Sequence, residues 1–361
     1  MESTKEIRTI NKLDKKSKMV AIWLLVGVFM IIIQIALGGL TRLTGSGLSM
    51  TEWEPIMGLL PPLSHDEWMK AFEAYQQIAQ YKYVNSHFTL KEFKFIFYWE
   101  WFHRNWARFL AVVFLVPFFY FLYKKYFTKE MITPLVLLFV FGALQGFIGW
   151  YMVQSGLDDS SLFYVSHIRL SVHLITALGL LVYTLWFALK ILIPRENIIR
   201  HTKLRNYYLI VIILFTIQLF YGAFMAGLHA ARIAPSWPKM NGHWFPPKLM
   251  EYNWIYDAVG VQFVHRGIAY ILYIMIIIGF FKVYKIAKDH NSKLLKRANY
   301  WSLILVNAQV ILGIYTLLAV SSIVKDKFGL YETLAQLHQI VAMLLLVSLM
   351  FKIYLIRGEK K

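Results

Sequence analysis

The stretch EWFHRNWARFLAVVF at residues 100–114 has a second copy at residues 262–276, QFVHRGIAYILYIMI, and this pair decides the fold. Each copy places a histidine followed by an arginine at the beginning of a long apolar run. The two histidines, His103 and His265, are 162 positions apart. Self-similarity at such a distance indicates that the chain is built from two similar halves.

The repetition extends along the chain. The other matches are IQIALGGLTRLTGSG (32–46) with IQLFYGAFMAGLHAA (217–231), ALQGFIGWYMV (143–153) with NAQVILGIYTL (307–317), and SVHLITALGLL (171–181) with AQLHQIVAMLLL (335–346). Each half therefore contributes four corresponding segments. We expect the halves to be residues 1–192 and 193–361.

The composition is that of an integral membrane protein. Of the 361 residues, 58% are hydrophobic and only 16% are charged, and the mean hydropathy is +0.51. Runs long enough to cross roughly 30 Å of hydrocarbon occur at residues 19–40, 105–123, 132–153, 168–192, 206–228, 258–281, 299–320 and 333–355. We therefore predict an all-α membrane protein with eight transmembrane helices, arranged as two tandem four-helix bundles with pseudo-two-fold symmetry.

The net charge of +18 could suggest a nucleic-acid partner, but the distribution of the basic residues argues against one. If the N-terminus is inside, the inner segments hold 24 lysines and arginines and the longer outer segments hold 10. This asymmetry is typical of membrane topology and predicts that both termini are cytoplasmic. We expect the lipid bilayer, and not a nucleic acid, as the partner of the basic surface. Residues 1–18 contain no apolar signal region, which favours the bacterial inner membrane.

A long outer segment, residues 41–98, is expected to have structure of its own. Ser64 followed by Glu67 is a capping box that predicts a helix. The apolar face of this helix comprises Trp68, Phe72, Tyr75 and Ile78. We expect the helix to lie along the outer interface or to cover a site below it. A second box, Thr89 with Glu92, precedes the second span.

Four histidines within the spans form two repeat-related pairs. His103 corresponds to His265, and His173 corresponds to His338. All four lie near the start of spans that run from outside to inside, so each half can present two imidazoles at the outer side. Two facing imidazoles suit the axial positions of a haem iron, whereas the absence of cysteine excludes thiolate-bound metals. The alternative is that each histidine is a packed, hydrogen-bonded residue, which is the commoner role of a lone histidine within a span.

Polar neighbours of these histidines are also duplicated. Arg104 and Arg266 follow the first histidine of each half and are expected either to pair with a haem propionate or to reach the interface as snorkelling arginines. Weaker propionate candidates are Arg42, Arg108 and Arg169. The repeated glutamines, for which we expect interhelical hydrogen bonds, are Gln34, Gln145, Gln218 and Gln309.

The two halves differ at one chemically important position. Glu100 precedes His103 by three residues, and the corresponding residue before His265 is Gln262. A carboxylate can take up a proton or face a developing positive charge, and an amide can only form hydrogen bonds. We therefore expect the N-terminal half to hold the reactive site and the C-terminal half a stable redox centre. The alternative is that Glu100 merely pairs with Arg104.

Three stretches resemble the haem A synthase family: GGLTRLTGSGLSMTEWEPIMGLLPP (38–62), EFKFIFYWEWFHRNWARFL (92–110) and SWPKM (236–240), together with the duplicated histidine segments. The resemblance covers essentially the whole chain and is closest to the branch shared by proteobacteria and mitochondria. It implies eight spans and oxidation of the C8 methyl group of haem O to the formyl group of haem A, for cytochrome oxidases. Two successive hydroxylations would give a gem-diol that loses water to form the aldehyde.

The same resemblance implies roles for individual residues. His103 and His173 would flank the iron of haem O or haem A, His265 and His338 would ligate haem b, and Glu100 would be the essential acid. A haem O synthase and an electron donor are expected partners. Many relatives carry a cysteine pair in their outer loops, to which a redox or substrate-transfer role is attributed. This role cannot apply to a chain without cysteine.

Two other functions are consistent with the four histidines. One is a non-catalytic di-haem electron carrier, such as a quinol-linked cytochrome b, in which Glu100 has no special role. The other is a haem transporter or assembly factor that holds haem and passes it on.

Overall fold

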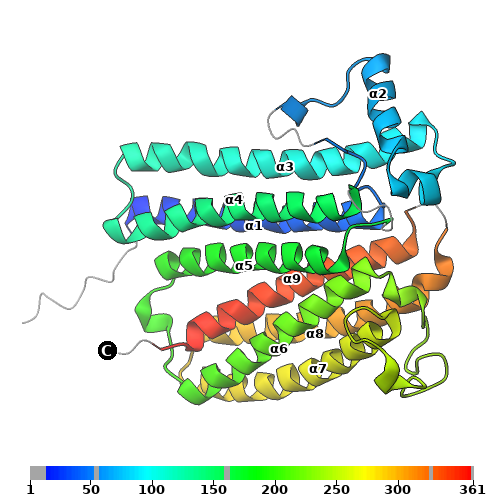
Figure 1. The fold of residues 1–361 in the computed structure, drawn as a ribbon. Helices are drawn as coiled ribbons and strands as arrows, with labels where there is room; N and C mark the ends of the chain where they lie inside the picture. Colours follow the sequence, from blue (N-terminus) through cyan, green and yellow to red (C-terminus); the bar gives the residue numbers. More distant parts are fainter. Residues whose placement is uncertain (1–13, 53–56, 158–162, 325–327, 359–361) are drawn as a thin grey trace, which may run out of the picture.

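The computed structural model describes residues 14–52, 57–157, 163–324 and 328–358, which form helices and no β-strand (Figure 1). The α-helices are α1 (Lys15–Leu43), α2 (His65–Gln76), α3 (Leu90–Tyr123), α4 (Lys129–Leu157), α5 (His167–Leu192), α6 (Thr202–Gly227), α7 (Ala258–Asp289), α8 (Lys293–Leu318) and α9 (Leu330–Ile356). Short 3₁₀ or π turns lie at Met57–Leu59, Tyr81–Asn85, Arg195–Asn197, Ala230–Arg232, Leu249–Glu251 and Ala319–Ser322. The predicted all-α class is confirmed.

Eight of these helices, all except α2, are long and apolar enough to cross a membrane. They correspond one by one to the eight predicted spans, so the chain is a multi-pass membrane protein. The main difference is α3, which begins at Leu90, well before the predicted start at residue 105. Its first turns are capped by Thr89 with Glu92, and they are too polar to be recognised as part of an apolar run.

Helix α2 packs on this extension of α3. Its capping box at Ser64 and Glu67 is present as predicted. The ring centroids of Trp68 and Phe97 are 5.0 Å apart, and those of Phe72 and Phe93 are 5.1 Å apart. The apolar face of α2 is therefore buried against α3, and α2 projects from one end of the helix bundle, which we call the α2 end (Figure 1).

The long helices contact one another in two groups. In one group, α1 packs on α3 and α5, and α4 packs on α5; in the other, α7 packs on α6 and α8, and α8 packs on α9. The two groups meet where α1 and α5 contact α9 and where α5 contacts α6. We call these contacts between the two groups, taken together, the seam. Division of the chain at residue 192 and a pseudo-two-fold axis between the halves remain predictions.

Candidate functional site

Each of the four predicted histidines contacts a glutamine of the preceding long helix. The glutamine Nε2 atoms lie 3.2 Å (Gln34 to His103), 3.0 Å (Gln145 to His173), 3.4 Å (Gln218 to His265) and 3.1 Å (Gln309 to His338) from a ring nitrogen. The predicted interhelical hydrogen bonds of the four glutamines are confirmed. Each histidine ring is thus in contact with a glutamine side chain of a neighbouring helix.

A glycine four residues after each glutamine lies against the same histidine ring. The glycines are Gly38, Gly149, Gly222 and Gly313, and a Cβ atom placed on them would lie 3.1, 2.8, 3.5 and 2.9 Å from the ring Cε1. Since four residues make about one helical turn, glutamine and glycine lie on one helix face and together form a notch for the ring. These glycines were not identified from the sequence, although the repeated spacing of glutamine and glycine was visible in it.

Alanine at a notch glycine should weaken haem binding. In Gly149→Ala the new methyl group overlaps the His173 ring, and the analogous Gly313→Ala displaces the ring of His338. Overpacking of this kind costs about 1–3 kcal/mol, so we expect haem affinity to fall about tenfold or more. Haem content after purification, measured by absorbance, tests this.

The matched control is Gly146→Ala on the same helix as Gly149, where an added Cβ meets no atom within 4 Å. This variant should keep its haem and be no less stable, because alanine favours a helix over glycine by about 1 kcal/mol. Equal haem content in Gly146→Ala and Gly149→Ala would contradict the role of the notch.

His103 lies close enough to His173 to interact with it electrostatically, and His265 lies close enough to His338. That each pair ligates one haem iron remains a prediction. In the described part of the chain, no three side chains of histidine, aspartate or glutamate gather as a cluster that could hold a metal ion. Two imidazoles in each half would suit the two axial positions of a haem iron, as predicted from the sequence.

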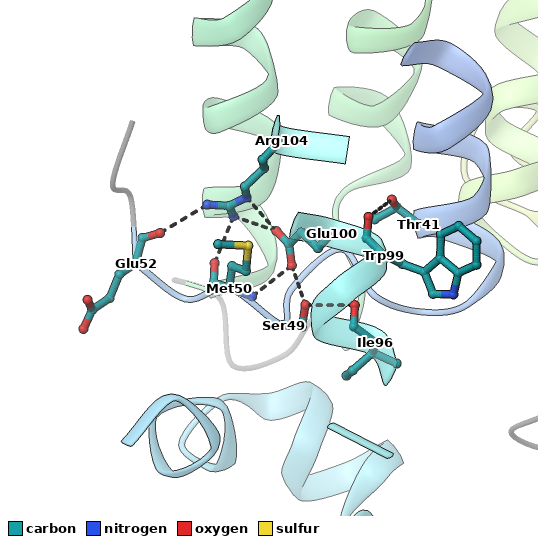
Figure 2. Close-up of polar contacts among 8 residues, drawn as sticks. All are labelled: Thr41, Ser49, Met50, Glu52, Ile96, Trp99, Glu100 and Arg104. Atoms are coloured by element: carbon teal, nitrogen blue, oxygen red, sulfur yellow. Dashed lines mark hydrogen bonds and ion pairs between the residues drawn. The ribbon is translucent and has the colours of Figure 1, made fainter. Parts of the chain in front are cut away.

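Glu100 is buried on α3 and accepts hydrogen bonds on both carboxylate oxygens, as Figure 2 shows. Its Oε1 accepts from the Nε and NH2 groups of Arg104 at 3.1 and 2.6 Å. Its Oε2 accepts from the Ser49 hydroxyl at 2.8 Å and from the backbone N–H of Met50 at 2.9 Å. These donors, one of them positively charged, hold both carboxylate oxygens in place.

The partner of Glu100, Arg104, also holds the loop that follows α1. Its guanidinium donates to the backbone oxygens of Met50 at 2.9 Å and Glu52 at 3.2 Å (Figure 2). The ion pair that was considered as the alternative role of Glu100 is therefore present. It does not leave the acid at a solvated interface, because the Glu100 side chain is only 3% exposed.

The corresponding residues of the other half hold a loop without an ion pair. Gln262 donates to the backbone oxygen of Ala234 at 3.1 Å. Arg266 donates to the backbone oxygens of Ala234 and Ser236, both at 2.9 Å. Each half thus uses two side chains, four residues apart, to fix the loop after its first helix, and only the N-terminal half has a carboxylate there.

The arginines that were predicted to pair with a propionate differ in whether their guanidinium nitrogens already have hydrogen-bond partners. All three nitrogens of the Arg104 guanidinium have partners, whereas NH1 of Arg266 is buried without one. Among the weaker candidates, Arg169 stacks on Tyr151, with its guanidinium carbon 3.9 Å from the ring centroid, and donates to the Tyr151 carbonyl. Ser49 and the Met50 backbone could not be identified from the sequence as partners of Glu100, because the sequence does not predict the path of their loop.

Comparison with known proteins identifies the family. A family model described as a cytochrome oxidase assembly protein, COX15-CtaA, matches residues 21–350. A protein of Flavobacterium johnsoniae named heme A synthase is 38% identical over 351 residues, which cover 95% of this chain and 99% of the relative. Proteins of the same name from Nitrosospira multiformis and Rickettsia africae are 38% and 35% identical, covering 93% of this chain and 94% and 98% of theirs. The chain therefore belongs to the COX15-CtaA family of cytochrome oxidase assembly proteins.

Proposed function

We propose that this protein is a haem A synthase, which oxidises the C8 methyl group of haem O to the formyl group of haem A for cytochrome oxidase. Membership of the family and the name shared by its relatives support the reaction. The single observation that carries the assignment to this chain is the unequal pair Glu100 and Gln262, a buried carboxylate beside one histidine pair and an amide beside the other.

The substrate pocket lies in the N-terminal half. His103 and His173 would hold the iron of haem O and of the product haem A, with their rings fixed by Gln34 and Gln145. Glu100 lies one helical turn from His103 on α3.

Glu100 acts through its negative charge. Both of its oxygens are occupied by donors, so its side chain is fixed and is poorly placed to exchange a proton. A fixed charge in a buried site stabilises positive charge that develops nearby, without reorganisation during the reaction. Positive character develops at the methyl carbon during its oxidation, and each of two hydroxylations would benefit from this charge. The gem-diol then loses water to form the formyl group.

The C-terminal half fits haem b as a resident cofactor. His265 and His338 supply two imidazoles, and the Nδ1 atom of each is buried without a partner. A buried polar atom without a partner is costly. A bound group that contacts these nitrogen atoms would remove this cost. Haem b would supply one-electron transfer when bound. Arg266, with its unpartnered NH1, is better suited than Arg104 to pair with a propionate.

We further propose that the α2 end faces away from the cytoplasm. The asymmetry of lysine and arginine supports this orientation, and the start of α1 and the end of α9 both lie at the end of the bundle opposite to α2 (Figure 1). Both termini would then be cytoplasmic in a bacterial plasma membrane, and both haem sites would lie toward the outer side. A haem O synthase would supply the substrate, and an electron donor and an oxidant would come from outside this chain.

Expression in a bacterium that accumulates haem O, because its own haem A synthase is deleted, tests this function. We expect the membranes to gain haem A and an a-type cytochrome spectrum. A di-haem electron carrier and a haem transporter both leave haem O chemically unchanged. Membranes that contain this protein with bound haem but still no haem A would reject the proposed reaction in favour of one of these two functions.

A further inference from the structure

Arg42 of α1, one of the weaker propionate candidates, lies at the seam. It donates to the backbone oxygen of Ala226 at the end of α6 and, at 3.2 Å, contacts the Nδ1 atom of His229. The hydroxyl of Tyr331, at the beginning of α9, is a third partner. A side chain of the N-terminal half is thus held by three residues of the C-terminal half, and its Nε is buried without a partner.

The positive charge of Arg42 is not neutralised by a carboxylate among the residues that the structure describes. Its partners are a carbonyl, a phenol and an imidazole. Burial and the nearby charges of Arg42 and Arg232 lower the pKa of His229 to about 3, so this imidazole is neutral at pH 7 and accepts a hydrogen bond from Arg42. An arginine side chain stays protonated in proteins, and a buried charge without a counter-charge is costly. The location therefore favours a bound anion.

The positions of Arg42 on α1 and of its partner Ala226 on α6 place the guanidinium near the histidine notches of both halves. On α1, Arg42 follows the notch glycine Gly38 by four residues, and on α6, Ala226 follows Gly222 by four residues. Arg42 and Ala226 are also corresponding positions of the repeat. Since Arg42 contacts Ala226, its guanidinium lies about one helical turn, ~6 Å along the axis, beyond both notches and toward the α2 end.

We propose that Arg42 binds a carboxylate of a porphyrin held by one of the two histidine pairs. This inference rests on the proposed function, since it requires a porphyrin at these pairs. The planar guanidinium matches a carboxylate in two parallel hydrogen bonds, and its unpartnered Nε is available for one of them. The propionates are the only carboxylates of haem O and haem b. Arg42 is a positioning residue, because it would fix the porphyrin and not touch the reacting methyl group.

The test compares binding of haemin, which has two free carboxylates, with binding of haemin dimethyl ester. Titrations use the full-length protein in detergent in two backgrounds, each with one histidine pair replaced by alanine: His265 and His338 in one, His103 and His173 in the other. In each background, Arg42 is compared with Arg42→Gln. Arg297→Gln, at the far end of α8, is the matched control for loss of one positive charge.

With Arg42 present, we expect haemin to bind at least about tenfold more tightly than its ester in one background, as loss of a hydrogen bond to a charged group predicts. That background identifies which porphyrin supplies the carboxylate. Arg42→Gln should remove the preference there, and Arg42→Lys, which keeps the charge without the planar fork, should retain part of it. Arg297→Gln should leave it unchanged.

An unchanged preference for haemin in Arg42→Gln, in both backgrounds, would overturn the inference. Thermal unfolding and size-exclusion profiles identify any variant that does not fold, and in that case Arg42→Lys decides the question. Failure of the proposed function has a different signature: folded proteins that bind neither haemin nor its ester in either background.

Discussion

In a Glu100→Gln variant, haem should remain bound while conversion of haem O to haem A falls at least about a hundredfold. The substitution keeps the shape of the side chain and removes its negative charge. The amide oxygen can accept from Arg104 in place of Oε1, while the Met50 N–H loses its acceptor Oε2. Arg104 still donates to the backbone oxygens of Met50 and Glu52, so the loop after α1 should remain in place. The C-terminal half has an amide at the corresponding position, where Gln262 donates to the backbone oxygen of Ala234. The expected defect is therefore in the reaction and not in binding.

The measurement is the ratio of haem A to haem O extracted from the purified variant, with total haem content determined on the same sample. Glu92→Gln is the matched control, because it removes a carboxylate from the same helix at the exposed N-terminal cap. The control should convert haem O at close to the wild-type rate. Normal haem A production by Glu100→Gln would show that the acid only fixes the loop.

Replacing either histidine of one pair should remove the porphyrin held by that pair and spare the porphyrin held by the other pair. In His265→Ala or His338→Ala, we expect the tightly bound haem b and its low-spin spectrum to be lost, because an alanine cannot ligate iron. In His103→Ala or His173→Ala, haem b should remain and the O-type or A-type haem should be lost. In the described part of the chain, the helices that carry the two pairs meet chiefly where α5 packs on α9, which is why the losses should be separable.

Optical and electron paramagnetic resonance spectra, with chromatographic identification of the extracted haems, measure both losses. His243→Ala, in an exposed loop, is the control and should retain both haems. A normal low-spin haem b spectrum in His265→Ala or His338→Ala would contradict the assignment of this pair. Loss of both haems from a folded protein would contradict the separation of the two sites.

Much of the fold could be predicted from the sequence, because a membrane-spanning helix can be identified from the composition of a single short stretch. An apolar run of about 20 residues has few stable alternatives to a membrane-spanning helix. Capping boxes are also local, and both Ser64 with Glu67 and Thr89 with Glu92 form as predicted. The early start of α3 at Leu90 could not be predicted from hydropathy, since its first turns pack on α2 and not on lipid.

The residues of the candidate site that could be predicted from the sequence are those at corresponding positions of the two repeats. Duplication identified the histidines and glutamines, and the structure pairs them across neighbouring helices. Contacts that depend on how distant segments approach were not predictable. They include the Ser49 hydroxyl on Glu100 and the guanidinium of Arg42 on Ala226, which are set by a loop path and by the seam.

The most direct test of this account is the chemical identity of the porphyrin after turnover. Purified protein is supplied with haem O, an electron donor and oxygen, and the non-covalently bound porphyrins are extracted and analysed by mass spectrometry. We predict a hydroxymethyl intermediate followed by a formyl group in place of the C8 methyl group. Recovery of haem O alone, from protein that holds haem at both histidine pairs, would contradict the account.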